Sequence, residues 1–446
     1  MTFKDFNLNK NLFKALDDMG IETPTTIQEK SFSVIMSGRD VVGIAQTGTG
    51  KTYAFLLPIL RQWTYSKDRI PKILILVPTR ELVAQIVEEI KKLSAYSNFE
   101  VVGAYGGTNI KTQVAAIEKG CDAVVATPGR LLDLCLKGVL KLRLIKRFVI
   151  DEVDEMLNLG FLPQLKRVID FLPAKRQNLL FSATMTDEVA AIIETFFNHP
   201  VRIEAAPVGT PLDNIVQSVF YVPNFNTKVS LLKYLLDVNP EYKKVLIFCS
   251  SKKTADLLFE EIEPTLGEET GVIHSNKSQN HRFNSVKKFT SGEYRILVAT
   301  DIVARGIDVS KVSHVINFEL PEKPENYIHR IGRTGRADKM GNAISFSTKK
   351  EEAFLAAIEY LMKYAIPLRE FPEEVEVSEV LLEFEIPVVK IKNSIENRKK
   401  PVSISGPAFH EKKDKNKKVN NKIRLKEKMM KKYGKPKTRG MKKKKK

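Results

Sequence analysis

Short apolar runs alternate with longer segments of helical periodicity along the first half of the chain. The runs lie at residues 41–45, 73–77, 101–105, 123–126, 148–150 and 179–181. Turn residues bound each run, and most runs precede a segment in which apolar residues recur at helical spacing. Alternation of this kind predicts β-α units, in which helices cover both faces of a parallel sheet.

A second series of apolar runs repeats this rhythm at residues 216–222, 245–249, 272–274, 296–299, 312–318 and 343–346. Between the two series, residues 205–211 are small and include two prolines, a composition typical of interdomain linkers. A chain of 446 residues is also longer than a single core usually becomes. We therefore predict two tandem α/β domains, at residues 1–207 and 208–370, followed by a C-terminal extension at residues 371–446.

The positive charge of the chain is concentrated at its end. The whole sequence has a net charge of +19, and residues 411–446 alone hold 19 Lys and Arg against 3 Asp and Glu. Such a block repels itself and cannot be buried, so we expect a disordered arm that is attracted to a polyanion. A tail that only increases solubility is the alternative.

The cysteines and the apolar segments exclude several classes of protein. Cys121, Cys135 and Cys249 are far apart and form no C-x-x-C pair, so neither a disulfide framework nor a zinc site is expected. Buried thiols in a reducing compartment are the simpler interpretation. The sequence has no long apolar span and no secretory leader, which predicts a cytoplasmic protein without membrane contact.

The first apolar run leads into a glycine-rich segment that precedes a predicted helix. This segment contains Thr47, Gly48, Thr49, Gly50, Lys51 and Thr52. Its glycines let backbone N–H groups face a phosphate chain, Lys51 can reach the β and γ phosphates, and the Thr52 hydroxyl can bind Mg²⁺. An ordinary glycine-rich turn is disfavoured because lysine and threonine fall in register as well.

Two carboxylates follow the apolar run that ends at Ile150. A carboxylate at the end of a buried parallel strand lies at the ligand-binding edge of the sheet, where Asp151 can hold Mg²⁺ through water. Glu152 is then placed to orient and deprotonate an attacking water molecule. Acidic strand ends usually mark a solvated helix start, but the upstream phosphate loop favours the catalytic interpretation.

Together with Pro-Thr-Arg-Glu-Leu at 78–82, Thr-Pro-Gly-Arg at 127–130 and Ser-Ala-Thr at 182–184, the first half resembles a DEAD-box RNA helicase. The resemblance implies two tandem RecA-like P-loop domains with parallel sheets flanked by helices, and ATP as the nucleotide. Upstream, residues 20–28 resemble the Q motif, which implies that Gln28 contacts adenine and that Phe3 packs beside the base. An ordinary core role for Phe3 is the alternative.

The second half completes the resemblance through segments at 279–282, 299–308 and 329–336. If the last segment were helical, Arg333 and Arg336 would share one face because they are three residues apart. The family assigns both arginines to the γ-phosphate, with Arg336 as the arginine finger. Asp308 is implied as a ribose contact.

The resemblance also implies RNA contacts and a set of residues that couple the two sites. The implied RNA contacts are Thr79, Arg80, Gly107, Thr127, Arg130, Arg282, Thr300 and Gly306. Coupling is implied for Asp154, Ser182, Thr184 and His329, with both hydroxyls expected to bond to Asp154. For Ser182 alone, a simple turn hydroxyl is the alternative. The contact types fit backbone recognition without base reading.

Two residues depart from the family pattern. Val153 replaces the usual alanine of the acidic box, and Thr26 replaces the second proline of the Q motif. Neither change removes a ligand or a base, although the larger valine puts the local packing in doubt.

We interpret the sequence as an ATP-dependent, Mg²⁺-requiring RNA helicase that separates short duplexes, in ribosome assembly or RNA turnover. Ribosomal precursors and the RNA-decay machinery are the corresponding partners. An RNA chaperone or scaffold that acts mainly through the basic tail is the main alternative, and a DNA translocase is a weaker one.

Overall fold

The computed structural model describes residues 2–46, 48–205, 214–301, 312–335 and 340–386. The first of its two sheets has seven strands in the order β3-β4-β2-β5-β6-β1-β7, and every strand pair is parallel. The strands are β1 (Val41–Ile44), β2 (Ile73–Leu76), β3 (Val101–Ala104), β4 (Ala123–Ala126), β5 (Arg147–Ile150), β6 (Gln177–Ser182) and β7 (Val201–Glu204).

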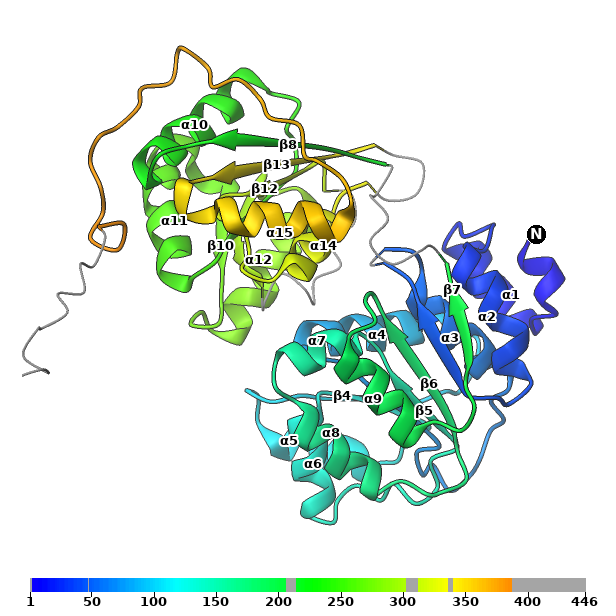
Figure 1. Cartoon of the computed structure of the whole chain (residues 1–446). Coiled ribbons are helices and arrows are strands. Elements are labelled where there is room, and N and C mark those ends of the chain that lie inside the picture. The colour runs from blue at the N-terminus through cyan, green and yellow to red at the C-terminus, as the bar shows by residue number, and fades with distance from the viewer. Residues whose placement is uncertain (1, 47, 206–213, 302–311, 336–339, 387–446) are drawn as a thin grey trace, which may run out of the picture. The chain divides into compact units, whose positions relative to one another are not determined.

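Helices cover both faces of this sheet (Figure 1). They are η1 (Phe3–Phe6), α1 (Lys10–Asp18), α2 (Thr26–Met36), α3 (Lys51–Arg61), α4 (Arg80–Leu93), α5 (Ile110–Glu118), α6 (Pro128–Leu136), α7 (Val153–Asn158), α8 (Leu162–Asp170) and α9 (Asp187–Phe196). Successive residues of a strand face opposite sides. Accordingly, Ile73 and Ile75 enter one hydrophobic core, and Leu74 and Leu76 enter the other.

The second sheet has six parallel strands in the order β10-β11-β9-β12-β13-β8. These are β8 (Ile215–Tyr221), β9 (Val245–Cys249), β10 (Thr270–Ile273), β11 (Ile296–Thr300), β12 (His314–Asn317) and β13 (Gly341–Ser347). The accompanying helices are α10 (Phe225–Val238), α11 (Lys252–Leu266), η2 (Gly267–Glu269), α12 (Gln279–Ser291), α14 (Pro324–Ile331), η3 (Lys349–Glu351) and α15 (Glu352–Met362).

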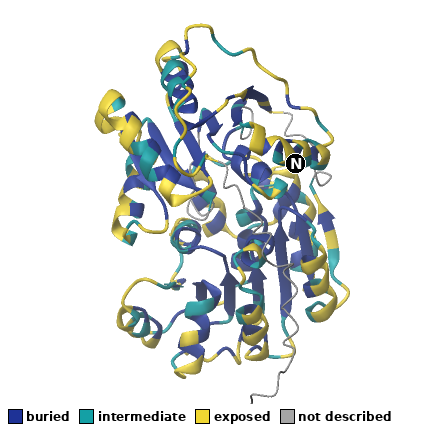
Figure 2. Cartoon of the chain, turned by 60° about the vertical axis from the view of Figure 1, so that its left-hand side comes forward, coloured by how far each residue is buried: buried dark blue, intermediate teal, exposed yellow. Residues whose placement is uncertain are grey.

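The predicted fold class is confirmed, because both sheets are parallel and flanked by helices. Figure 2 shows the buried strands inside and the exposed faces of the helices outside. The sequence did not predict β7, whose burial is only partial. The proposed boundary near residue 208 lies outside the described residues, so the domain limits remain a prediction, as does the disordered tail.

Residues 371–386 continue past α15 as an irregular segment that packs on the second sheet. Val375 is buried in the core of that sheet, and Ser378 N donates to Thr227 Oγ1 at 3.0 Å. Near the end of the segment, Glu385 Oε1 accepts a hydrogen bond from Phe225 N at 2.6 Å. The sequence pattern gave no indication of this packing.

The expectation of buried free thiols is confirmed for all three cysteines. Burial raises the pKa of Cys121 to about 12 and that of Cys135 to about 11. In the part of the chain that the structure describes, no helix is long and apolar enough to cross a bilayer.

Candidate nucleotide and RNA site

The phosphate loop connects β1 to α3 and depends on glycine geometry. Gly48 and Gly50 have left-handed backbones, with φ of 83° and 87°. A Cβ at Gly50 would lie 2.4 Å from Gln28 Nε2, so a larger residue would collide with the Q-motif amide. Thr49 Oγ1 donates to the Gln46 carbonyl at 2.8 Å. Thr47 lies outside the described residues.

Lys51 begins α3 and is only 7% exposed. Its Nζ is buried and has no hydrogen-bond partner among the described residues. A buried ammonium without a hydrogen bond is costly even with carboxylates nearby, so its persistence indicates a site built for a negatively charged ligand. The start of α3 adds free backbone N–H groups beside it, and Thr52 follows as the second helical residue. These features fit the phosphates of a nucleotide.

Gln28 lies in α2 and links the Q motif to the phosphate loop. Its Oε1 accepts from Thr25 N and its Nε2 donates to the Gly50 carbonyl, both at 3.0 Å. A primary amide has two donor hydrogens and two acceptor positions, so one of each remains for an adenine edge. Thr26, which departs from the family pattern of the Q motif, is the exposed first residue of α2. This position accepts threonine or proline.

Phe3 belongs to the hydrophobic core of the first sheet. It is 2% exposed and packs edge-on against Phe6, with ring centroids 5.4 Å apart. This burial agrees with the core alternative considered above. Contact between Phe3 and an adenine base remains a prediction.

The acidic box joins β5 to α7 through an unusual backbone conformation. Glu152 has φ of 51°, a left-handed value that is rare for residues other than glycine. Its backbone N–H donates to Asp151 Oδ1 at 3.0 Å. Val153 is fully buried in the core of the first sheet, so the larger side chain that replaces alanine is accommodated.

Burial dominates the acid–base behaviour of this box. Burial raises the pKa of Asp151 to about 6, although the charge of Lys51 opposes the shift. Burial likewise raises the pKa of Glu152 to about 7, although the charge of Arg333 opposes it. Glu152 Oε2 is buried and has no hydrogen-bond partner among the described residues. A buried carboxylate oxygen without a hydrogen bond is costly, so Glu152 fits a site that takes up a donor such as a water molecule.

Arg333 follows α14 and is 5% exposed. Because α14 ends at Ile331, Arg333 lies in a turn, so the helical condition for a shared face with Arg336 is not met at Arg333. The charge of Arg333 nevertheless opposes the rise in the pKa of Glu152, which lies between β5 and α7 in the first half of the chain. Arg336 and Asp308 lie outside the described residues.

The coupling residues surround Asp154. Thr184 donates twice to Asp154 Oδ2, from its N–H at 2.9 Å and from its Oγ1 at 2.8 Å. Ser182 makes a different contact, because its Oγ donates to the Thr184 carbonyl at 2.7 Å. The expected Ser182–Asp154 bond is therefore wrong, since the turn at 182–184 directs the Ser182 hydroxyl back to its own backbone.

His329 of α14 reaches the same acidic cluster from the second sheet. Its Nδ1 lies 2.7 Å from Glu155 Oε1 and its Nε2 lies 3.7 Å from Asp154 Oδ2. Burial alone would raise the pKa of Asp154, but His329, Lys51 and the Thr184 hydrogen bonds outweigh it and hold the pKa below its usual value. Asp154 therefore stays charged and connects the acidic box to the second sheet.

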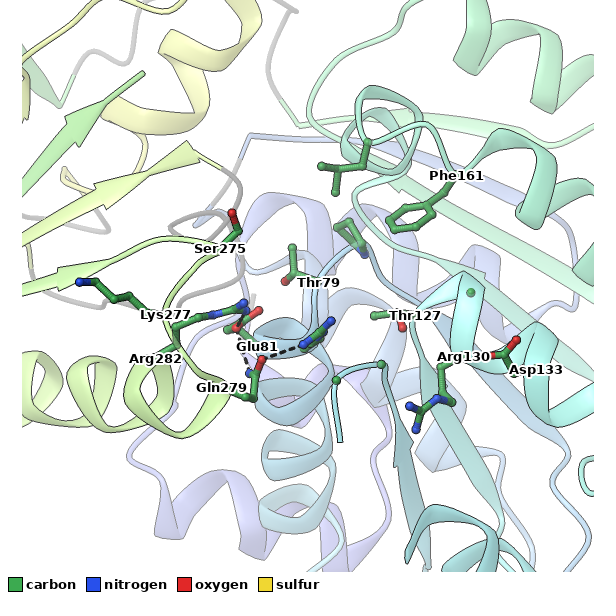
Figure 3. A pocket seen from close by; sticks show the side chains of 16 residues that line it. Thr79, Glu81, Thr127, Arg130, Asp133, Phe161, Ser275, Lys277, Gln279 and Arg282 are labelled. Atoms are coloured by element: carbon green, nitrogen blue, oxygen red, sulfur yellow. Dashed lines mark hydrogen bonds and ion pairs between the residues drawn. The ribbon is translucent and has the colours of Figure 1, made fainter. Parts of the chain in front are cut away.

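A pocket of about 690 Å³ brings together most of the predicted RNA-binding residues. Figure 3 shows Lys277 and Arg282 across this pocket from Thr127 and Arg130. Residues from both halves of the chain line the pocket. The predicted RNA contacts among them are Thr79, Arg80, Gly107, Thr127, Arg130 and Arg282.

Arginine side chains give this pocket its positive charge. Burial, followed by the nearby charge of Arg282, lowers the pKa of Arg80. Gly107 has φ of 78°, and a Cβ there would lie 1.8 Å from Arg80 Nη1. Glycine is therefore required for Arg80 to lie over this turn. Arg130 donates to Gln113 Oε1 at 2.8 Å and to the Thr108 carbonyl at 3.1 Å, which fixes its position.

Thr300 ends β11 and lines a neighbouring pocket of about 460 Å³ rather than the first one. The two pockets share Leu159 and Ser275. Thr300 therefore lies next to the other predicted RNA contacts. Gly306 lies outside the described residues.

Several residues in this region were missed by sequence reasoning. Glu81 is 6% exposed; it forms an ion pair with Arg282 and accepts from Gln279 Nε2 at 3.1 Å. Gln279 Oε1 in turn accepts from Arg80 Nη1 at 3.1 Å. The buried Arg330 pairs with both carboxylate oxygens of Asp301, at 2.6 and 2.9 Å. All of these residues stand inside the motifs, but sequence gives no sign of which charges pair.

Comparison with known proteins identifies the family of this chain. The family description "DEAD/DEAH box helicase" matches residues 25–192, and "Helicase conserved C-terminal domain" matches residues 227–338. The chain is 40% identical over 365 residues to the DEAD-box ATP-dependent RNA helicase CshA of Geobacillus kaustophilus, covering 81% of this chain and 77% of that protein. It belongs to the DEAD-box ATP-dependent RNA helicases.

Other members of the DEAD-box family are similarly close. The ATP-dependent RNA helicase DbpA of Bacillus subtilis is 38% identical over 400 residues, covering 89% of this chain and 81% of that protein. S. cerevisiae Dbp5 bound to RNA and ADP BeF3 superposes with a TM-score of 0.75 at 31% identity, covering 83% and 95% of the two chains. Mss116p bound to ssRNA and AMP-PNP gives 0.77 at 29% identity, covering 84% and 81%.

Family membership makes this chain an enzyme of the ATPase and RNA helicase class that binds ATP and RNA. Among the described residues, no group of three or more His, Cys, Asp or Glu side chains is arranged to hold a metal ion. The Mg²⁺ site expected here contains one carboxylate, Asp151, and one hydroxyl, Thr52. Magnesium binding therefore remains a prediction.

Proposed function

We propose that this helicase couples ATP binding and hydrolysis to the separation of short RNA duplexes and the remodelling of RNA–protein complexes. One observation carries the proposal. Lys51 and Glu152, in the first half of the chain, each have a buried polar atom without a hydrogen-bond partner among the described residues. The charge of Arg333, in the second half, opposes the rise in the pKa of Glu152. A nucleotide whose phosphates are bound by Lys51 and Arg333, with the attacking water held by Glu152, would be held from both halves of the chain. Its binding energy could then favour one arrangement of the halves over another.

In this proposal, Lys51 and the N–H groups of the loop hold the phosphates. Thr52 and Asp151 would hold Mg²⁺, which when bound would supply further positive charge to the phosphates. Glu152 takes a proton from the attacking water, and a pKa of about 7 suits a base that works near neutral pH. Arg333 and Arg336 stabilise the γ-phosphate, Gln28 and Phe3 contact adenine, and Asp308 contacts the ribose.

The RNA strand lies in the pocket lined by Thr79, Arg80 and Arg282 and continues toward Thr300. Guanidinium and hydroxyl groups bind phosphates and sugars, so contact is independent of base sequence. Asp154, Thr184 and His329 link this groove to the ATP site. A groove that fits one bent strand, as in the family, would displace the partner strand of a short duplex.

Substitution of Glu152 by Gln tests the assignment of the base. The substitution keeps the shape of the side chain but removes its basicity, so turnover should fall by about 10²–10⁴ while ATP and RNA binding persist. Glu118→Gln, on the exposed face of α5, is the matched control and should leave turnover unchanged. Turnover of the Glu152 variant within a few fold of wild type would refute the assignment.

The basic tail supports a second candidate function, that of an RNA chaperone or scaffold. Deleting residues 398–446 separates the two proposals. Strand separation that survives at high RNA concentration supports the helicase, whereas its complete loss with ATPase intact supports the scaffold. Truncation should also reduce the slope of log affinity against log salt, because the tail neutralises phosphates.

We propose ribosome assembly or RNA turnover in the cytoplasm as the setting, with ribosomal precursors or RNA-decay proteins as partners. Cross-linking in cells, followed by identification of the bound RNA, decides between the two. Equal stimulation of the ATPase by DNA and by RNA would instead support a DNA translocase.

A further inference from the structure

The edge of the first sheet opposite the phosphate loop carries a concentration of positive charge. We define the amino-edge surface as the segments that precede the strands, at residues 37–40, 62–72, 94–100, 119–122, 137–146, 171–176 and 197–200. These segments contain eleven Lys and Arg against four Asp and Glu. Residues 1–410 as a whole have a net charge of only +3, so the excess on this edge is not a general property of the body.

Hydrogen bonds place the segments that carry this charge in one row. Lys146 N donates to the Lys72 carbonyl at 2.8 Å, and Gln177 N donates to the Lys146 carbonyl at 2.9 Å. Gln177 Nε2 continues the row by donating to the Arg39 carbonyl at 2.8 Å. The row thus crosses the starts of β2, β5, β6 and β1, which are neighbours in the sheet. With a strand spacing of about 4.8 Å, it is roughly 14 Å long.

Two of the four carboxylates on this edge, those of Asp40 and Asp122, are buried. Asp40 is buried and accepts from Asn178 N at 2.7 Å. Asp122 is also buried and accepts from Trp63 Nε1 at 3.1 Å and from Glu100 N at 3.0 Å. Neither carboxylate lies beside the lysines as an exposed counter-charge.

The basic side chains of the row are open to a ligand. Lys146 and Lys175 are exposed and Lys72 is half-buried. Within residues 2–205, apart from 47, no hydrogen bond or ion pair engages the side chains of these three lysines. Arg147, the first residue of β5, is partly buried and donates to Gln62 Oε1 through Nη2, so it adds positive charge beside the row rather than an open contact.

The composition of the amino-edge surface indicates which kind of polyanion it binds. Seven of the eleven basic residues are lysine, a residue that is depleted in protein–protein interfaces and common in contacts with phosphate. Lysines act as point charges that contact phosphates without reading bases, so this composition suits a phosphate chain rather than a specific protein partner.

We propose that the amino-edge surface is a second binding site for the phosphate backbone of RNA, distinct from the pocket between Thr79 and Arg282. The proposal rests on the RNA-binding function of the family but not on the assignment of the catalytic residues. A structured RNA would be held at this surface by part of its backbone while a single-stranded end occupies the pocket. The site would thus act on affinity for structured RNA and leave the chemistry unchanged.

The test uses the full-length triple variant Lys72→Glu, Lys146→Glu, Lys175→Glu. Its control is Lys243→Glu, Lys287→Glu, Lys349→Glu, which makes the same charge change at exposed positions of the second half. Affinity for an RNA hairpin with a single-stranded extension is measured across a range of salt concentrations, together with ATPase activity stimulated by a short oligouridine. The first variant should bind the hairpin about tenfold more weakly and lower the salt slope by about 2–3, with oligouridine-stimulated ATPase unchanged.

Hairpin affinity and salt slope equal to those of the control variant would overturn the proposal. If charge reversal disturbs folding, the milder variant Lys72→Gln, Lys146→Gln, Lys175→Gln replaces it, with the same expectation at a smaller magnitude. Selective loss of binding to an acidic protein, with RNA affinity intact, would also refute the RNA assignment. Absence of any RNA-stimulated ATPase in the wild-type protein would instead count against the proposed helicase function.

Discussion

Two lysines are buried in the part of the chain that the structure describes, and their surroundings are opposite. Lys228 lies in α10, where its Nζ donates to the Phe318 carbonyl at 2.8 Å and pairs with Glu351 Oε2 at 2.8 Å. Lys51 starts α3, and its Nζ has no hydrogen-bond partner among the described residues. Burying a charge is costly unless it is paired. The comparison indicates that Lys228 stabilises the fold, whereas Lys51 is held ready for a ligand.

Two arginines of one motif also differ, in where their partners lie. Arg330 is 1% exposed, and its guanidinium is held by Asp301 and by the Glu319 carbonyl at 2.6 Å. Arg333 Nε donates to the His329 carbonyl at 3.3 Å, and the charge of Arg333 opposes the rise in the pKa of Glu152, which lies in the first half of the chain. Arg330 therefore organises the second half internally, whereas Arg333, like His329, interacts with the acidic box of the first half.

The largest expected effect comes from removing the structural lysine. Lys228→Met leaves Glu351 buried without its cation, which should cost about 3–5 kcal/mol of unfolding free energy. Chemical denaturation, with hydrogen exchange followed in β12 and β13, measures the loss. Lys233→Met, a partly buried lysine on the same helix, is the control and should change stability by less than about 1 kcal/mol. Equal effects of the two changes would remove the distinction between the lysines.

Lys51→Met should show the reverse pattern. Loss of a preorganised cation at the phosphates should lower turnover by about 10²–10³. The unfolding free energy should change by no more than about 1 kcal/mol, because removing a buried charge offsets the loss of its attraction to Asp151. ATPase assays and denaturation of the same preparation check both parts. A large loss of stability would mean that Lys51 is structural, like Lys228.

The two hydroxyls of the 182–184 turn should differ in a smaller way. Thr184→Val removes a hydrogen bond to the charged Asp154, so stimulation of the ATPase by RNA should fall about tenfold, with ATPase activity in the absence of RNA retained. Ser182→Ala removes only a bond to the Thr184 carbonyl and should leave stimulation within about twofold. Stimulation measured for both variants tests the contrast, and equal losses would contradict the assignment of Asp154 and Thr184 to coupling.

The smallest expected effect concerns a buried group that must stay neutral. His314 stacks on Tyr242 with ring centroids 3.6 Å apart, and burial lowers its pKa to about 4. Because the unfolded chain binds this proton more readily, stability should be complete above pH 6.5 and should decline as the pH falls toward 4. His314→Gln should flatten this part of the stability–pH curve. A parallel decline in both proteins would exclude His314 as its source.

Local patterns predicted much of the site because its chemistry is carried by contiguous motifs. The glycine-rich loop, Asp151 and Glu152 each follow a buried strand, and parallel strands bring their carboxyl ends to one edge. Such placement follows from topology alone. The partner of a given side chain does not, as Ser182 shows: its bond to the Thr184 carbonyl depends on how one turn closes.

Some features had no local signal at all. Residues 371–386 contain apolar residues without regular spacing, yet Val375 fills a gap in the second core. Arg333 follows a helix that ends two residues earlier, so helical spacing gave the wrong reason for its placement. For Val375, contacts between residues far apart in sequence outweigh the local pattern.

The amino-acid sequence by itself determined the two α/β halves, the family, the phosphate loop and the acidic box, because each depends on short-range periodicity or on residues adjacent in the chain. Only the tertiary structure decided which buried charges are paired and which are left for ligands. It also decided that basic residues from separate loops form one row at the amino edge. The pairing and burial of charged side chains depend on contacts between residues far apart in sequence. These contacts determine the free-energy cost of removing each charge from water.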